Sequence, residues 1–369
     1  MSDLITPVTM PKWGLSMTEG AITDWFVDVG DDISVGDDLV DIETTKITNC
    51  FESPVEGTVR ALAAEVGDTV PVGAIICVLA PESVSDDEVA AYVEEHKANF
   101  VPDEGGADGP ARLVLNLPAH AISVATAGDT EGTATPALLL HGFGGDANNW
   151  LFNLEALGAD RPVFAVDMPG HGQSTKQVGD GTLAEMAEIV GQLIESLEVK
   201  RVHLVGHSMG GAIALKFALD NPGSVASLSL LSAAGLPGTK PNRDYLDGFV
   251  EARRRKDLKP HAQLLFADEE QVTRDMLEDL IRFKRIDGVE ACLSALKDNL
   301  LTDDLAIDPA GLSVPAIALH SQSDQIVGAP DEGALGPVAL TWIENAGHMP
   351  HMEQADKVNE NLVAHMAAN

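Results

Sequence analysis

One serine of the chain stands in a setting that favours nucleophilic chemistry. Ser208 lies in RVHLVGHSMGGAIAL, where the apolar pattern of a strand runs into that of a helix, and small residues surround it in Gly206-His207-Ser208-Met209-Gly210. Such glycines let the backbone turn sharply, and the first helical amides then face the seryl oxygen. A serine becomes a good nucleophile only beside a base. We therefore expect a histidine and a carboxylate near Ser208, with His207 as a structural residue beneath the turn.

Three further motifs stand at the ends of strand-like segments in the order that such a site requires. They are HGFGG at residues 141–145, SDQIV with Asp324, and NAGHMPH with His348. Together with the serine motif they resemble the α/β-hydrolase family across residues 112–369. The strand-like segments alternate with amphipathic ones, which indicates a mostly parallel sheet with helices on both faces. The helical, charged interval at about 236–305 predicts a cap over one end of that sheet.

The resemblance implies a role for each motif. Ser208 is then the nucleophile, His348 the general base and acid, and Asp324 the carboxylate that orients the imidazole and stabilises its protonated form. The backbone amides of Phe143 and Met209 are the implied oxyanion hole, with each donor contributing about 3 kcal/mol to transition-state stabilisation.

Two neighbouring residues compete for these roles. His351 follows His348 by three positions, but Gly347 permits the loop conformation that the family has before its histidine. We therefore favour His348 and expect His351 to start or pack against the next helix. Asp331 is the alternative to Asp324, and it lies deeper in a loop that contains proline.

The loop after the first buried strand also has the spacing of a dinucleotide site. Gly142, Gly144 and Ala147 follow the pattern G-x-G-x-x-A, and Asp167 comes 20 residues after Ala147. We favour an oxyanion loop, because a His-Gly-aromatic-Gly-Gly segment suits that role and the other hydrolase motifs are present. No HExxH motif or other histidine and carboxylate spacing indicates a metal site.

The densest basic cluster of the sequence lies in the predicted cap. A solvated helix face is its simplest interpretation. The alternative hypothesis is that its guanidinium groups hold the phosphates of coenzyme A above the serine. The cluster consists of Arg253, Arg254, Arg255 and Lys256, with Lys259 nearby.

The first 80 residues contain an internal repeat. Residues 20–44 match residues 57–81, a shift of 37 positions, in glycines and in apolar residues at equivalent places. The matched pairs include Gly20 and Gly57, Gly30 and Gly67, Gly36 and Gly73, Ile22 and Val59, Val29 and Val66, Ile33 and Val70, and Leu39 and Ile76. The pattern of each copy predicts a small antiparallel sheet, and two such sheets would pack as a flattened sandwich.

A single lysine, Lys46, lies between the two copies in DIETTKITN, at the expected tip of a hairpin. This arrangement resembles the lipoyl domains of 2-oxoacid dehydrogenase complexes over residues 1–80. The resemblance implies that a lipoate ligase attaches lipoic acid to Lys46 in amide linkage. Biotin carriers flank their lysine with methionines, whereas Thr45 and Ile47 flank this one, so lipoate is favoured over biotin. The alternative is an exposed hairpin lysine without modification.

An acidic linker at residues 81–111 separates the two predicted domains. It contains nine acidic residues against Lys97 and ends in Gly, Pro and Asp. Ser85 and Glu88 form a capping-box pattern before apolar positions, which predicts one short helix in an otherwise extended tether.

Composition narrows the possible partners. The 23 basic and 58 acidic residues give a net charge of −35, which disfavours binding to nucleic acids or to anionic membranes. No apolar run is long enough for a membrane helix and no signal peptide is visible, so we expect a cytoplasmic protein. The three cysteines, Cys50, Cys77 and Cys292, show no CxxC pair, and we expect all three to be ordinary buried thiols.

The two domains together resemble the acyltransferase components of acetoin dehydrogenase complexes. The resemblance implies that a thiamine-diphosphate enzyme cleaves acetoin and loads acetyl on the arm, and that a flavin dihydrolipoyl dehydrogenase reoxidises it. It also implies a homo-oligomer within the complex. We expect Ser208 to accept the acetyl group and coenzyme A to remove it. Two alternatives stay open: a tethered thioesterase or esterase that uses water, and a lipoyl carrier and scaffold whose second domain is silent.

Overall fold

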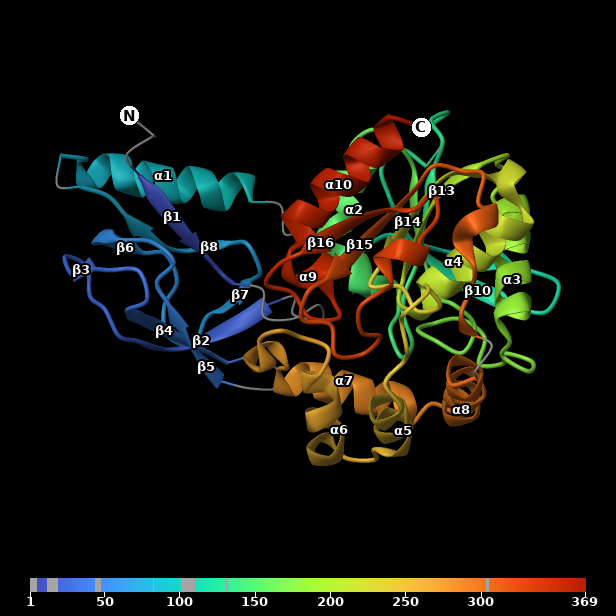
Figure 1. Cartoon of the computed structure of the whole chain (residues 1–369). Coiled ribbons are helices and arrows are strands. Elements are labelled where there is room, and N and C mark those ends of the chain that lie inside the picture. Colours follow the sequence, from blue (N-terminus) through green and yellow to red (C-terminus); the bar gives the residue numbers. More distant parts are fainter. Residues whose placement is uncertain are drawn as a thin grey trace. The chain divides into compact units, whose positions relative to one another are not determined.

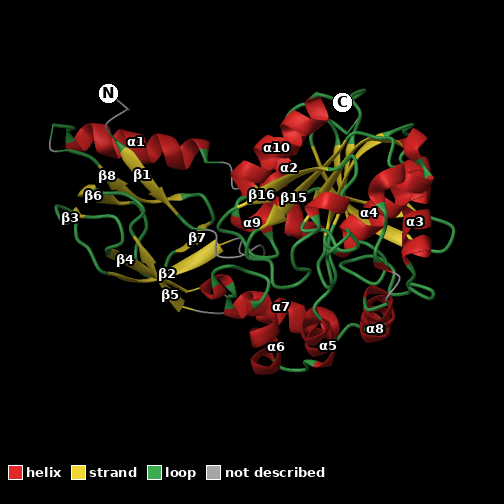
Figure 2. Cartoon of the chain, viewed as in Figure 1, coloured by secondary structure: helices red, strands yellow, loops and turns green. Residues whose placement is uncertain are grey.

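The computed structural model describes residues 5–11, 19–43, 48–81, 83–100, 110–130, 132–302 and 305–369 of the 369-residue chain. The chain forms two compact units, Met1–Gly109 and Pro110–Asn369, coloured along the sequence in Figure 1. In the described residues the first unit consists of strands and a helix, whereas the second combines strands with many helices (Figure 2). The predicted fold class, a small β sandwich followed by an α/β-hydrolase fold, is confirmed.

The first unit contains two four-stranded antiparallel sheets, with strand orders β1-β8-β6-β3 and β5-β4-β2-β7. The two copies of the repeat exchange strands: β3 of the first copy pairs with β6 of the second, and β7 of the second pairs with β2 of the first. Neither sheet therefore forms from one copy alone. The strands are β1 (Thr6–Thr9), β2 (Glu19–Trp25), β3 (Asp32–Ile33), β4 (Asp38–Glu43), β5 (Thr48–Glu52), β6 (Gly57–Leu62), β7 (Thr69–Pro71) and β8 (Ile75–Leu79).

Most of the matched apolar pairs of the repeat form the core between these sheets. Both members are buried in the pairs Ile22 and Val59, Ile33 and Val70, and Leu39 and Ile76. Val29 and Val66 are the exception, since both are about 60% exposed, at 60% and 59%. The period-two pattern thus marks the core correctly within strands and fails in the turns between them.

The predicted helix of the linker is α1 (Asp86–Asn99), and Ser85 and Glu88 form its capping box. Its position differs from the expectation of an extended tether. Val89 and Val93 are buried in a cluster with Val78 of β8, so the helix packs against the sheet and extends the first unit beyond residue 80. Burying these valines favours docking because each buried apolar side chain contributes about 1.5–3 kcal/mol.

The second unit is built on an eight-stranded sheet of order β16-β15-β14-β13-β11-β12-β10-β9. Strands β11 to β16 form the parallel part of the sheet. Strands β10 and β9 continue it at one edge with antiparallel pairing. The strands are β9 (Arg112–Asn116), β10 (Ala121–Ala127), β11 (Ala137–Leu140), β12 (Val163–Val166), β13 (Val202–His207), β14 (Val225–Leu231), β15 (Ala316–Ser321) and β16 (Ala339–Ile343).

Helices cover both faces of this sheet, as Figure 1 shows for α3 and α4 and for α2 and α10. Alternate residues of β11 enter different cores: Leu138 and Leu140 pack with α3 and α4, whereas Leu139 packs with α2 and α10. These helices and the short α9 are α2 (Leu151–Gly158), α3 (Leu183–Ser196), α4 (Met209–Asp220), α9 (Pro350–Glu353) and α10 (Ala355–Ala367), with 3-10 turns η2 (Ala147–Trp150), η3 (Pro222–Ser224), η6 (Pro309–Gly311) and η7 (Glu332–Ala334).

Four mutually packed helices form the cap between β14 and β15, in the interval where the sequence predicts it. Their amphipathic faces join the core that lies on the α3 and α4 side of the sheet, through residues such as Leu246, Leu258 and Leu293. The cap consists of α5 (Arg243–Glu251), α6 (Arg255–Gln263), α7 (Arg274–Lys284) and α8 (Val289–Leu300), with the 3-10 turn η4 (Glu269–Gln271).

The cysteine prediction is wrong for one residue. Cys77 and Cys292 are buried, but Cys50 is exposed on β5. Cys50 Sγ lies 3.4 Å from Asp38 Oδ1, and partial burial together with this carboxylate raises the pKa of the thiol to about 11. None of the helices in the described part of the chain has the length and apolar character to cross a bilayer.

Candidate active site

Ser208 occupies the sharp turn that the glycines predict. β13 ends at His207, α4 begins at Met209, and Ser208 between them has φ 53° and ψ −116°. A Cβ on Gly206 would lie 2.3 Å from the carbonyl oxygen of Gly210, and one on Gly210 would lie 2.4 Å from that of Leu140. Only glycine fits at either place, so the motif reflects crowding of backbone against backbone. This strained turn places the serine at the N-terminus of α4.

Asp324 and His348 come from the loops after β15 and β16, and their side chains meet. His348 Nδ1 lies 2.9 Å from Asp324 Oδ2, and Asp324 Oδ1 accepts hydrogen bonds from the amides of Ile326 and Val327. Burial favours the neutral carboxyl, but the charge and hydrogen bond of His348 and the amide of Ile326 together lower the pKa of Asp324 to about 2. An ionised Asp324 only accepts, so Nδ1 of His348 carries the proton and Nε2 is left as the basic nitrogen.

The competing residues have other contacts. His351 is fully buried, with its ring 4.6 Å from that of Trp150 and 4.5 Å from that of His207. Asp331 accepts from the amide of Gly333 as the N-cap of η7. Neither side chain therefore stands where it could orient His348 or replace it.

His207 lies beneath the turn, as expected, and it also supports the histidine loop. Its Nε2 donates to the carbonyl oxygen of His348 at 2.7 Å. Burial, with a contribution from His351 and His348, lowers the pKa of His207 well below its usual range. The neutral ring is therefore a fixed donor that ties the loop of His348 to the end of β13.

Two buried histidines hold the loop that contains Phe143. Gly144 donates its amide to Nε2 of His171 at 3.1 Å, and Met168 donates its amide to Nε2 of His141 at 3.0 Å. Both rings must be neutral to accept, and burial indeed lowers the pKa of each. The amide of Gly144 is thus already used and is not available to an oxyanion.

Asp167 anchors the other end of this loop. Its carboxylate accepts from the amide of Ala147 at 2.8 Å and forms a 2.7 Å ion pair with Arg112. The Asp167 side chain is fully buried, so it is not available to a ribose hydroxyl. The geometry therefore disfavours the dinucleotide interpretation and supports a structural role for the G-x-G-x-x-A spacing.

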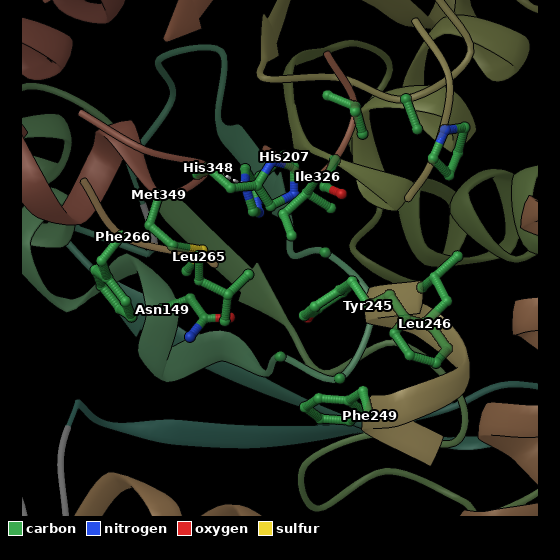
Figure 3. A pocket seen from close by; sticks show the side chains of 18 of the residues that line it. Asn149, His207, Tyr245, Leu246, Phe249, Leu265, Phe266, Ile326, His348 and Met349 are labelled. Atoms are coloured by element: carbon green, nitrogen blue, oxygen red, sulfur yellow. Dashed lines mark hydrogen bonds between the residues drawn. The ribbon is translucent and has the colours of Figure 1, made fainter. Parts of the chain in front are cut away.

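Ser208, His348 and the Phe143 loop line one pocket. The cap supplies much of its wall, and Figure 3 shows side chains of α5 and of the segment after α6 beside His348 and His207. Apolar side chains dominate the lining. They include Phe143, Tyr245, Leu246, Phe249, Leu265, Phe266, Met276, Leu280, Ile326, Val327, Met349 and Met352.

A buried lysine of the cap, which the sequence analysis did not identify, supports this wall. Lys284 Nζ donates to the carbonyl oxygens of Phe249 and Ala252 at the end of α5 and lies 5.1 Å from the ring centre of Phe249. Burial, and then the charge of Arg253, lower the pKa of Lys284 to about 8. The sequence gave no signal for it, because charged residues occur throughout this amphipathic helix.

Glu353 links the cap to the histidine loop and was also missed. Its two carboxylate oxygens accept from the amides of Ala267 and Gly347, each at 2.7 Å. Burial raises the pKa of Glu353 even though these hydrogen bonds oppose it. Gly347 directly precedes His348, so this carboxylate fixes the backbone that presents the imidazole.

The remaining candidate residues lie apart from this pocket or cannot be placed. Lys46 lies outside the described residues, and the flanking strands β4 and β5 pair as far as Glu43 and Thr48. Arg253 forms an ion pair with Glu290. Arg254 and Arg255 line a separate pocket on the cap, whereas Lys256 does not. Among the described residues, no group of three His, Cys, Asp or Glu side chains is placed to bind a metal ion.

Both units of the chain are similar to known protein families. A family model described as "Alpha/beta hydrolase family" matches residues 137–361, and one described as "Biotin-requiring enzyme" matches residues 6–79. The dihydrolipoyllysine-residue acetyltransferase component of the acetoin cleaving system of Pseudomonas putida is 43% identical over 371 residues, which cover 99% of each chain. The chain belongs to this family of acetyltransferase components. The protein of the same name from Cupriavidus necator is 40% identical, over 99% of this chain and 98% of its own.

Solved structures share the fold of the second unit of this acetyltransferase component. A 2-hydroxy-6-oxo-6-phenylhexa-2,4-dienoate hydrolase of Rhodococcus has a TM-score of 0.63 at 21% identity, covering 70% of this chain and 99% of its own. A bacterial membrane phospholipase A has a TM-score of 0.61 at 24% identity, covering 70% and 86%. At this level of identity the likeness concerns the fold alone.

Proposed function

We propose that the protein transfers an acetyl group from a lipoyl arm on Lys46 to coenzyme A through Ser208, His348 and Asp324. One observation carries the proposal: Ser208 and His348 line the same apolar pocket, and His348 is hydrogen-bonded to an ionised Asp324. The full-length likeness to two acetyltransferase components of acetoin cleaving systems supports the choice of donor.

The first unit provides a suitable place for the arm. Strands β4 and β5 pair up to Glu43 and Thr48, and Lys46 lies in the four residues between them. A lipoyl group in amide linkage there would supply a sulfur that carries acetyl as a thioester. The apolar lining of the serine pocket suits a hydrocarbon arm of this kind.

In the first step Ser208 Oγ attacks the acetyl carbon while Nε2 of His348 takes the hydroxyl proton. Asp324 stabilises the imidazolium, and the amides of Phe143 and Met209 donate to the oxyanion. The carbon–sulfur bond then breaks, His348 returns the proton to the departing sulfur, and the acetyl group remains as an ester on Ser208.

In the second step His348 takes the proton of the coenzyme A thiol, whose sulfur attacks the acetyl ester. The carbon–oxygen bond breaks, the proton returns to Ser208, and acetyl-coenzyme A leaves. Water is the competing acceptor, and the apolar lining contributed by the cap limits its access.

Tethering the arm to the second unit favours the first step. A substrate on a short linker reaches an effective concentration in the millimolar range. The arm would receive its acetyl group from a thiamine-diphosphate enzyme that cleaves acetoin and would be reoxidised by a flavin dihydrolipoyl dehydrogenase, so the proposal places the chain in a complex with both.

The test is to acetylate the arm of the lipoylated full-length protein, add coenzyme A, and quantify acetyl-coenzyme A and acetate. We expect acetyl-coenzyme A from the wild type and a loss of at least 1,000-fold in Ser208→Ala, because the nucleophile is removed. Lys46→Arg, which cannot carry the arm, is the control for transfer from added thioester. Serine-dependent acetate would instead identify a tethered hydrolase, and product formation independent of Ser208 would refute the triad mechanism.

A further inference from the structure

The cap contains a second pocket, separate from the one that holds Ser208. Four guanidinium groups line it, together with Glu278 and Ile281. We call it the arginine pocket. The four basic residues are Arg254, Arg255, Arg282 and Arg285.

This concentration of positive charge contrasts with the rest of the chain. The protein has a net charge of −35, yet residues 252–259 contain five basic residues and only Asp257 as an acid. The arginines outnumber Glu278 four to one in the lining, and a concave surface with an excess of one sign of charge attracts small ions of the opposite sign. The pocket is therefore suited to a compact polyanion.

The pocket's ion pairs leave its arginines able to bind a ligand. Arg254 pairs with Asp257 at 2.8 Å, Arg282 pairs with Asp279 at 2.9 Å, and Arg255 pairs with Glu278. The three arginine side chains are between 43% and 66% exposed. Exposed pairs of this kind contribute about 0–1 kcal/mol each, whereas bidentate contacts between guanidinium groups and phosphate are among the stronger hydrogen bonds.

The start of α6 adds donors to the same place. Arg254 is the N-cap residue of this nine-residue helix, and no side chain caps its first turn. The first amides of a helix have no partner within the helix, and they favour an anion. These amides belong to the same short stretch as Arg254 and Arg255, and Asp257 in the first turn already supplies one negative charge there.

Helix α7 connects the arginine pocket to the serine pocket. Met276 and Leu280 line the serine pocket, whereas Arg282 and Arg285 line the arginine pocket. At 3.6 residues per turn, these two pairs lie about 180° apart around the helix. One helix of roughly 10 Å diameter therefore separates a cationic pocket from the candidate nucleophile.

We propose that the arginine pocket binds the phosphates of coenzyme A, whose thiol is the acceptor at Ser208. The proposal rests on the proposed function. The 3′-phosphate and the diphosphate together carry about four negative charges near neutral pH. To bind them, the arginines would exchange their exposed ion pairs with Asp257, Glu278 and Asp279 for contacts with phosphate.

The structure also divides the basic run of the sequence. Arg254 and Arg255 line the pocket, whereas Arg253 pairs with Glu290 outside it. Arg282 and Arg285 join from a helix that lies about 30 positions later in the chain. The site is therefore made by two helices, and Arg253 provides a matched control.

The experiment measures binding directly, by calorimetry on the full-length protein with coenzyme A, adenosine 3′,5′-bisphosphate and pantetheine as probes. We expect the double variant Arg282→Ala and Arg285→Ala to weaken binding of the two nucleotides at least ten-fold. Arg253→Ala should bind them as the wild type does, and unchanged melting temperatures would show that each variant folds. Acetyl transfer to pantetheine, which has no phosphate, should proceed at the wild-type rate in both variants.

Three results would overturn the proposal. The first is unchanged nucleotide binding in the double variant, and the second is displacement of the bisphosphate by an equal concentration of inorganic phosphate. The third is a double variant that transfers acetyl to pantetheine more slowly from the tethered arm but at the normal rate from free acetyl-lipoamide. That result would make the pocket a docking surface for the acidic first unit. A wild type that forms only acetate would refute the proposed function, while the binding data would still decide the role of the pocket.

Discussion

Two buried histidines make the second unit sensitive to acid. His351 is fully buried, and both of its ring nitrogens lack a hydrogen-bond partner among the described residues. Burial, with a contribution from His348, lowers the pKa of His351 to about 3. His203 is 3% exposed, and burial followed by the charge of Arg161 lowers its pKa to about 4.

The sign and size of the effect follow from these values. An unfolded histidine has a pKa of about 6.5, so the unfolded chain takes up protons first and stability falls as the pH drops below 6.5. Below pH 6.5 the loss is about 2.3RT for each pH unit, so between pH 6.5 and pH 5 it is about 2 kcal/mol for each histidine. His351 and His203 together therefore account for about 4 kcal/mol of the free energy of unfolding.

Five more histidines of the second unit act in the same direction. Burial lowers the pKa of each of them, so each adds to the loss of stability as the pH falls below 6.5. The loss of about 4 kcal/mol from His351 and His203 is already a large part of the total stability of a domain, about 5–15 kcal/mol. We therefore expect the second unit to become markedly less stable between pH 6.5 and pH 5. The five are His141, His171, His207, His320 and His365.

Urea unfolding of the full chain between pH 7.5 and pH 5.5, followed by tryptophan fluorescence, measures this loss, since Trp150 lies against His351. His351→Phe keeps an aromatic ring and removes the titration. Between pH 7.5 and pH 5.5 the variant should therefore lose about 1.4 kcal/mol less of its free energy of unfolding than the wild type loses. His96→Gln, at an exposed position of α1, is the control and should leave the slope unchanged. A wild-type stability that stays constant over this range, or a slope that is equal in His351→Phe, would refute the reasoning.

Two further predictions concern the geometry around His348. Asp324→Asn should lower kcat for acetyl transfer about 10,000-fold with little change in melting temperature, because the amide no longer fixes the Nδ1–H tautomer; a loss below ten-fold would remove Asp324 from the mechanism. Glu353→Gln should reduce stability by about 1–3 kcal/mol. The carboxylate accepts hydrogen bonds from two backbone amides, and in the variant one of these amides faces an NH₂ group that cannot accept. The substitution should also slow fluorophosphonate labelling of Ser208, and an unchanged labelling rate would show that Glu353 does not position the histidine loop.

The sequence predicted the parts of the site that depend on local chemistry. The turn at Ser208 could be predicted because the crowding at Gly206 comes from Gly210 and Gly211, which follow within five residues. The pairing of Asp324 with His348 could be inferred only from a family resemblance, since 24 residues separate them and the strand order of the sheet brings them together.

Residues that act through tertiary contacts were missed. Lys284 binds the carbonyl oxygen of Ala252 at the end of α5, 32 residues earlier in the chain. Glu353 accepts from the amide of Gly347, six residues before it, and also from the cap. The docking of α1 was missed for a related reason: two valines in an acidic segment carry little signal until a partner surface is known. Composition likewise could not show that Cys50 points outward, because neighbouring strand residues alternate between faces.

What distinguishes a transferase from a hydrolase on this fold is the acceptor rather than the triad. Ser208, His348 and Asp324 would activate water as readily as a thiol, and the likeness of the second unit to hydrolases is one of fold. Selection must therefore come from groups that hold the acceptor at the acyl-serine while the apolar cap excludes water. A helix with an apolar face toward the serine and a cationic face toward solvent meets both requirements, because it separates the charge that binds a nucleotide from the dry pocket where the thiol reacts.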